Sequence, residues 1–207
     1  RLLELAHALW SNFDLRLAGQ DELQRLHAAI GRPVQLSALD GWHRVVVDAQ
    51  DSAQGSGARS QVGLRQPLHA SAAGRAMLAY MGPAEQARLL EQPASTQASP
   101  KKQPTLASLR GVLDLTRARG YAVDESPGAD GSLSIAAPIL NSEGKAIGAV
   151  SATGPAHATD AALLHGLSPE VIRAARTITH SAGGQYMTIA PRAAPEAGQD
   201  FAITSVV

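Results

Sequence analysis

A run of small residues at the start of an expected helix has the clearest capacity for ligand chemistry in this chain. The segment from Pro67 to Tyr80 predicts an extended approach over 64–68 and then a helix over 70–81. Small side chains at such a junction let a ligand reach backbone N–H groups that have no intrahelical acceptor, and the helix dipole favours an anion there. The junction is therefore a candidate carboxylate-binding site, although Ala- and Gly-rich helix starts also serve close packing alone.

Hydroxyl side chains interrupt an apolar strand pattern in the second half of the chain. In the expected strand over 132–140, Leu133 and Ile135 share one parity, whereas Ser132 and Ser134 share the other. Successive side chains of a strand point to opposite faces, so the polar face around Ser134 must contact something. A lined pocket explains this face, and so does solvent.

The motifs of common enzyme classes are missing from the sequence. The segment 131–135 lacks the second glycine of a G-x-S-x-G nucleophile elbow. The 7 histidines show no H-E-x-x-H spacing, no G-x-x-x-x-G-K-[ST] occurs, and the absence of cysteine excludes disulfides and thiolate metal sites. We therefore expect no enzyme activity, no cofactor and no metal; a hydrolase whose Ser and His meet only in the fold is the open alternative.

Composition predicts one globular domain that does not itself bind nucleic acid. A chain of 207 residues, 44% of them hydrophobic, can bury a substantial core as a single unit. Its 18 basic and 18 acidic residues cancel, and no long basic run offers an electrostatic footprint for DNA. Because no apolar run approaches a membrane span and no charged-then-apolar leader opens the sequence, we expect a cytoplasmic location.

Helical periodicity predicts two helices before the first strand. Apolar residues recur at helical spacing over 1–18, which we expect to form a leading amphipathic helix that ends at Gly19. Asp21 is expected to cap a second helix that stops at Gly31.

Turn and strand signals then organise the rest of the chain. Two β-rich runs, 34–39 and 42–48, flank Asp40-Gly41, which is a two-residue hairpin signal. Further strands are expected over 59–64, 121–126, 132–140 and 145–153, and further helices over 83–91, 105–120 and 168–181. The polar loop over 92–104 is expected to show weak protection from hydrogen exchange, and the tail over 185–207 to be partly mobile. Together these elements predict an α+β domain with a central, mainly antiparallel sheet.

Four blocks of sequence, in this order and at this spacing, carry a family resemblance. They are residues 67–80, 119–125, 131–139 and 147–155, and the opening segment and the hairpin over 33–48 agree with them. Over residues 1–184 the chain resembles the effector-binding domain of the IclR family of bacterial transcriptional regulators. The resemblance implies a GAF/profilin-like fold of about six strands, which binds a small metabolite between the sheet and residues 68–80.

The resemblance also implies which residues contact the ligand. Ala72 and Ala73 match positions whose backbone amides meet a ligand carboxylate. The positions whose side chains bond the ligand correspond to Asp124, Ser134, Ser151 and Thr153. Position 134 is often Cys in the family, and positions 151 and 153 are typically both Ser, so Ser134 and Thr153 are departures that leave the ligand's identity open. We expect a small 2-oxo, hydroxy or related organic acid, with an aromatic acid as the main alternative.

On the residues alone, blander interpretations of these positions remain open. Asp124 could be a solvated strand end, and the hydroxyl groups could simply bond backbone groups. His69, which precedes the junction, could serve packing alone.

The resemblance implies a larger regulator around this domain. Such regulators carry a winged helix-turn-helix domain before the effector domain, and we interpret the chain as a fragment without it. Operator DNA is then a partner only of that missing domain, and the fragment itself is expected to form a dimer or tetramer. The alternative is a free-standing GAF-like signalling or interaction module.

Overall fold

A six-stranded sheet forms the centre of the fold. The computed structural model describes residues 2–51, 62–91, 106–125 and 131–184. The strand order is β3-β2-β1-β6-β5-β4, and every neighbouring pair is antiparallel. The strands are β1 (Val34–Asp40), β2 (His43–Gln50), β3 (Arg65–Pro67), β4 (Ala122–Asp124), β5 (Ser132–Leu140) and β6 (Ala146–Pro155). This architecture confirms the predicted α+β class.

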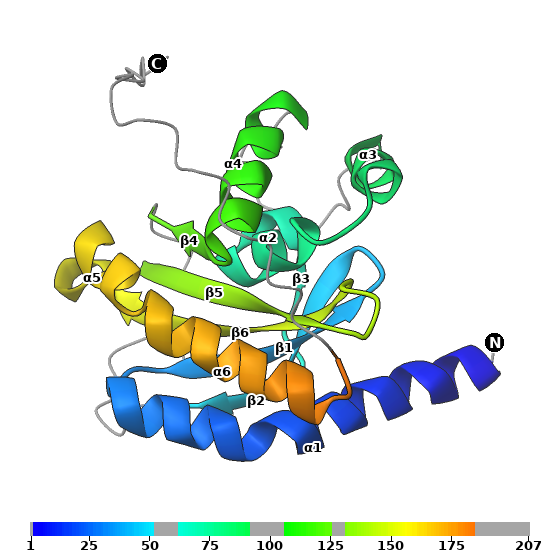
Figure 1. The fold of residues 1–207 in the computed structure, drawn as a ribbon, viewed down its shortest axis with the longest axis horizontal. Helices are drawn as coiled ribbons and strands as arrows, with labels where there is room; N and C mark the ends of the chain where they lie inside the picture. The colour runs from blue at the N-terminus through cyan, green and yellow to red at the C-terminus, as the bar shows by residue number, and fades with distance from the viewer. Residues whose placement is uncertain (1, 52–61, 92–105, 126–130, 185–207) are drawn as a thin grey trace.

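Helices cover both faces of the sheet (Figure 1). On one face α1 (Leu2–Ile30) and α6 (Ser168–Ser181) pack against each other, and on the other face lie α2 (Ala72–Leu78) and α4 (Leu106–Arg119). Other helical segments are α3 (Pro83–Glu91), α5 (Ala161–Gly166) and the short 3₁₀ helices η1 (Leu68–Ala70) and η2 (Ala156–Ala158). The first half of α1 extends beyond the sheet toward the N-terminus.

Strand alternation divides the interior into two apolar clusters. Leu133 and Ile135 of β5 belong to the cluster beneath α1 and α6, together with Ile178. Ala136 belongs to the other cluster, beneath α2 and α4, together with Met77. Each long strand therefore serves both clusters, because its odd and even side chains point to opposite faces.

Gly19 does not end a helix, which corrects the expectation of two helices before the first strand. α1 runs unbroken through Gly19 and Asp21 to Ile30. A Cβ atom built on Gly19 would lie 2.7 Å from Cδ2 of Leu36 and 3.5 Å from Ile178, so glycine permits α1 to approach the sheet closely. Packing thus offsets its poor helix propensity, which is about 1 kcal/mol relative to alanine. Gly31, with φ of 63°, ends the helix as predicted.

Two strand boundaries also differ from the expectation. The hairpin loop is Gly41-Trp42, because Asp40 still pairs with His43 and Gly41 takes the positive φ at the first loop position. The strand expected over 59–64 is instead β3, and residues 59–61 lie outside the described residues.

Helix ends show further differences. α2 is shorter than the expected helix over 70–81, because the separate turn η1 precedes it and Ser71 caps its start. α5 was not predicted, although its cap is recognisable in the sequence: the side chain of Asp160 accepts a hydrogen bond from the Leu163 amide at 2.8 Å. The expected bounds of β5, α3 and α6 agree with the structure. The loop over 92–104 and the tail over 185–207 lie outside the described residues.

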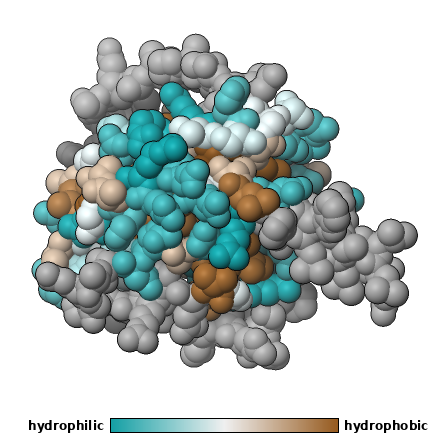
Figure 2. Space-filling view, turned by 90° about the horizontal axis from the view of Figure 1, so that it is seen from below, coloured by the Kyte–Doolittle hydropathy of each residue, from teal (hydrophilic) through white to brown (hydrophobic). Residues whose placement is uncertain are grey.

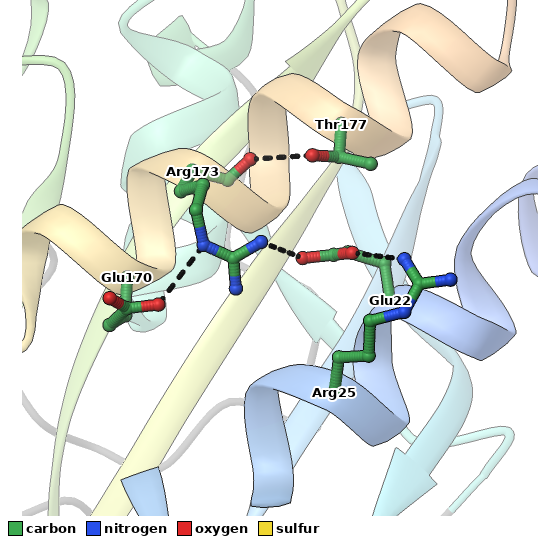
Figure 3. Close-up of polar contacts among 5 residues, drawn as sticks. All are labelled: Glu22, Arg25, Glu170, Arg173 and Thr177. Carbon is green, nitrogen blue, oxygen red and sulfur yellow. Dashed lines mark hydrogen bonds and ion pairs between the residues drawn. The ribbon is translucent and has the colours of Figure 1, made fainter. Parts of the chain in front are cut away.

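A buried carboxylate connects α1 to α6 (Figure 3). The Glu22 side chain is 3% exposed, and its two oxygens accept from Nη1 of Arg25 at 2.8 Å and from Nη1 of Arg173 at 2.7 Å. Arg173 in turn reaches Glu170 at 3.1 Å on its own helix. Figure 2 shows the molecule from below the view of Figure 1, the side on which α1 lies. The surface there is largely hydrophilic, with smaller hydrophobic areas. The charge network therefore lies between this polar surface and the apolar cluster.

Removal of the Glu22 charge should cost more stability than removal of the exposed Glu170 charge. Glu22→Gln leaves two arginines without their shared carboxylate, but both are half-exposed and regain water, so we expect a loss of about 1–2 kcal/mol in the free energy of unfolding. Glu170→Gln should change it by less than about 0.5 kcal/mol. Urea denaturation measures both, and equal losses would contradict the importance of burial.

Candidate ligand-binding site

Strand register brings the predicted polar residues together on one face of the sheet. Asp124 of β4 pairs with Ser134 of β5, and Ser134 pairs with Thr153 of β6. In the next row, Ala136 of β5 pairs with Ser151. Directly opposed residues in antiparallel strands point to the same face, so these four polar side chains form a continuous patch. Ser151 is buried, and the other three are partly exposed.

Helix α2 covers this face. Ala72 and Ala73, the first two residues of α2, are 0% and 3% exposed. The hydroxyl of Ser71 accepts a hydrogen bond from the Gly74 amide at 3.2 Å, and its carbonyl accepts one from the Arg75 amide at 2.9 Å. The amides of Ala72 and Ala73 belong to the first turn and so have no intrahelical acceptor. The structure thus places Ala72 and Ala73 at the start of α2 and the four polar site residues on the sheet face that α2 covers.

Gly74 has a packing reason that the ligand hypothesis did not include. A Cβ atom built on Gly74 would lie 2.0 Å from the carbonyl oxygen of Leu68, which belongs to the preceding turn. The backbone of α2 therefore approaches η1 too closely for any side chain. Close packing, and not access for a ligand, therefore explains why this position is a glycine.

Arg75 is a site residue that sequence reasoning did not identify. Its Nη2 atom lies 3.3 Å from Oδ1 of Asp124, and the two side chains are 14% and 20% exposed. The guanidinium also donates to the carbonyl oxygens of His69 and Val123, each at 3.3 Å. The signal in the sequence was a single charged residue within an otherwise small and apolar helical run.

A second polar cluster continues the patch across β1. Gln35 pairs with Ser151 across the β1–β6 ladder, so the two side chains share a face. The guanidinium of Arg44, which is 7% exposed, donates to Gln35 at 3.3 Å, to Ser37 at 3.0 Å and to Gln66 at 3.1 Å. Arg44 lies within a β-rich run, and its polarity at a buried position is the signal that sequence reasoning passed over.

These groups suit recognition of a polar ligand by hydrogen bonding. The patch offers hydroxyl groups as donors and acceptors and one carboxylate held by an arginine. Within the described ranges, no hydrogen bond joins Ser134, Ser151 or Thr153 to a histidine, and no cluster of His, Cys, Asp or Glu has the makings of a metal site.

A separate hollow of about 820 Å³ lies elsewhere on the molecule. Its lining comes from α1, the ends of β1 and β6, and the end of α6, and includes Leu17, Leu39 and Ala182. None of the predicted site residues borders it, so it is not the site described above. In the part of the chain that the structure describes, no helix is long and apolar enough to cross a membrane.

Comparison with known proteins gives the family. The family model described as "Bacterial transcriptional regulator IclR C-terminal" matches residues 7–180. The chain therefore belongs to the IclR family of bacterial transcriptional regulators. It is 28% identical to the HTH-type transcriptional regulator XynR of Escherichia coli (strain K12) over 183 residues, which are 88% of this chain and 73% of XynR. XynR and a second relative, KdgR of Dickeya chrysanthemi, are both named as HTH-type transcriptional regulators rather than enzymes.

Solved structures share this fold. The crystal structure of the Thermotoga maritima IclR has a TM-score of 0.76 and 25% identity, with 88% of this chain and 74% of that chain covered. An IclR homolog from Microbacterium hydrocarbonoxydans, complexed with 4-hydroxybenzoate, has a TM-score of 0.68 and 24% identity, with 83% and 69% covered. The chain spans 56% of the length of the regulator BhcR of Paracoccus denitrificans and 51% of the length of KdgR of Dickeya chrysanthemi.

Two glycine-to-alanine substitutions should change stability in opposite directions. Gly74→Ala places a methyl group against the Leu68 backbone and should lower the free energy of unfolding by roughly 3 kcal/mol. Gly111→Ala, in exposed mid-helix with no atom within 4 Å of the built Cβ, should raise it by about 0.5–1 kcal/mol. Thermal or urea unfolding measures both, and a neutral Gly74→Ala would mean that η1 and α2 separate readily.

His69 should make stability sensitive to mild acid. Its burial lowers the imidazole pKa below 6.5, and the charges of Arg75 and then His43 lower it further. The unfolded chain therefore takes up the proton at a higher pH than the folded chain, so this contribution is complete above pH 6.5 and is lost as pH falls below that value. His69→Asn should reduce the fall in the urea midpoint between neutral pH and mild acid. The same substitution at exposed His180 is the control, and parallel pH profiles for wild type and His69→Asn would contradict the idea.

Proposed function

We propose that this chain is the small-molecule-sensing domain of an IclR-type transcriptional regulator and that it binds a small organic acid between α2 and the sheet. The amides of Ala72 and Ala73 would receive the carboxylate of the acid. The side chains that complete the site are Asp124, Ser134, Ser151 and Thr153. The single observation that carries the proposal is the row Asp124–Ser134–Thr153, which three strands align beneath α2.

Charge balance supports an acid as the ligand. A second carboxylate near an uncompensated Asp124 would be repelled by roughly a few kcal/mol at the intermediate dielectric of such sites. The Arg75–Asp124 ion pair compensates that charge. An acid that also carries a hydroxyl group can therefore bind with its carboxylate at the α2 start and donate its hydroxyl to Asp124.

An aromatic acid is the second candidate. The related protein from Microbacterium hydrocarbonoxydans was crystallised with 4-hydroxybenzoate, which combines a carboxylate with a hydroxyl group. Ala122 and Ala136, which border the patch, are fully buried in the cluster beneath α2, and this close packing favours a small 2-oxo or hydroxy acid. The size of the preferred acid distinguishes these candidates.

We propose that α1 carries the signal to a preceding winged helix-turn-helix domain that contacts operator DNA. α1 is attached to the sensing domain by Glu22 and Arg173, and its first half extends beyond the sheet (Figure 1). The proposal includes a cytoplasmic location and self-association as a dimer or tetramer. A free-standing GAF-like module is the alternative, and the coding sequence upstream of residue 1 distinguishes the two.

A matched pair of threonine variants tests ligand sensing. In a thermal-shift screen of small organic acids, at least one acid should raise the melting temperature of the wild type, because it binds only the folded state. Thr153→Val removes one hydroxyl group with almost no change of shape. It should lower the affinity for that acid about fivefold to tenfold, as measured by calorimetry. Thr177→Val, on α6 at the other face of the sheet, should leave its affinity unchanged. No active acid, or equal effects of the two variants, would contradict the proposal.

A further inference from the structure

Arg75 joins three segments at the edge of the candidate site. From α2 it reaches the carbonyl of His69 in η1 and the carbonyl of Val123 in β4, and it forms the ion pair with Asp124 at the end of β4. β4 is the last strand of the sheet order, so one of its edges has no strand partner among the described residues. Arg75 is thus a direct link between the helix over the site and the edge strand that carries the site's carboxylate.

The contacts of Arg75 orient the Asp124 carboxylate. A guanidinium is a rigid planar fork, and two carbonyl oxygens from different elements hold this one in place. The ion pair engages Oδ1 of Asp124. No hydrogen bond to either Asp124 side-chain oxygen occurs within the described part of the chain, and we take Oδ2 as the acceptor for a ligand donor.

Among the contacts of Arg75, only the one with Asp124 neutralises its charge within the described residues. The two carbonyl oxygens are neutral, and Asp124 is the acidic group that Arg75 contacts within the described residues. Both side chains are largely buried, so solvent and salt screen their interaction less than that of a surface pair. The pair is neutral as a unit, and it can lie beside a bound carboxylate without net repulsion.

We infer that Arg75 is a positioning residue for effector recognition: it compensates the charge of Asp124 and fixes that carboxylate so that Oδ2 accepts a hydrogen bond from a hydroxyl group of the bound acid. This inference rests on the proposed function and makes it more specific. The site then selects a hydroxy acid over the same acid without its hydroxyl group, and Arg75 is responsible for that preference although it does not contact the ligand.

Two matched pairs of acids measure this preference. Lactate is compared with propionate, and 4-hydroxybenzoate with benzoate, by calorimetry on the whole chain. For the pair that binds, the wild type should bind the hydroxy acid on the order of tenfold more tightly than the acid without the hydroxyl group. The reason is that the second acid cannot form the hydrogen bond to the charged Asp124. Asp124→Asn should reduce this preference, because the neutral amide oxygen is the weaker acceptor.

A double-mutant cycle separates the effect of Arg75 that acts through Asp124 from simple tethering of α2. Arg75→Met should abolish the hydroxyl preference and weaken the plain acid about tenfold, because Asp124 is left uncompensated. In the Asp124→Asn background, where no carboxylate remains to be positioned, Arg75→Met should change the preference for the hydroxy acid by less than about twofold. The control is Arg117→Met, which removes an equal charge and a tether of the segment directly after α2, since Arg117 donates to the carbonyls of Ala79 at 2.6 Å and Met81 at 3.3 Å. It should leave the preference unchanged.

The outcomes are distinguishable from one another. If thermal melting shows that Arg75→Met does not fold, Arg75→Lys replaces it: this variant keeps the charge but loses the planar fork, so it should retain affinity for the plain acid and lose hydroxyl preference. An unchanged hydroxyl preference in the folded variant, or an equal loss of that preference in both Asp124 backgrounds, overturns the positioning role alone. If none of the four acids binds the wild type, proposed function and inference both fail for these acids.

Discussion

The antiparallel register of β5 against β4 and β6 is the constraint on which the rest of this structure depends. Side chains alternate along a strand, so a slip of one residue would exchange the two faces of β5. Ile135 would then leave the cluster beneath α1 and α6, and Ser134 would enter it. The buried apolar side chains of one face thus hold the register that aligns Asp124, Ser134 and Thr153 on the other face. Core packing and the candidate site are two consequences of one alignment.

Arginine side chains then connect the helices to this sheet and to each other. On one face Arg173 joins α6 to the buried Glu22 of α1, and on the other Arg75 joins α2 to Asp124 of β4. The two pairs differ in what is buried. Glu22 is enclosed while its arginines reach solvent, which suits attachment between helices. Arg75 and Asp124 are both largely enclosed, which suits a fixed charge distribution beside a ligand.

The glycines show how far local sequence signals reach. Gly31, Gly120 and Gly183 all have positive φ, and helices end at them as predicted, because that backbone conformation is a local property. Gly19 and Gly74 are glycines for a different reason, namely the close approach of other atoms of the chain. For Gly74 the neighbour is Leu68, only six residues earlier, and close packing was the local alternative for this helix start. For Gly19 the neighbours are Leu36 and Ile178, and no local pattern around this glycine contains that information.

The sequence by itself determined the α+β class, the bounds of β5, α3 and α6, and the family, because periodicity, stop signals and ordered blocks are encoded locally. It also marked six candidate site residues, of which two begin α2 and four lie on the sheet face that α2 covers. Only the tertiary structure decided that α1 is continuous through Gly19 and that Arg75 belongs beside Asp124. The physical reason is that both depend on contacts between segments distant in the chain, 48 positions apart for the Arg75 bond to Val123, whose energies no local propensity contains.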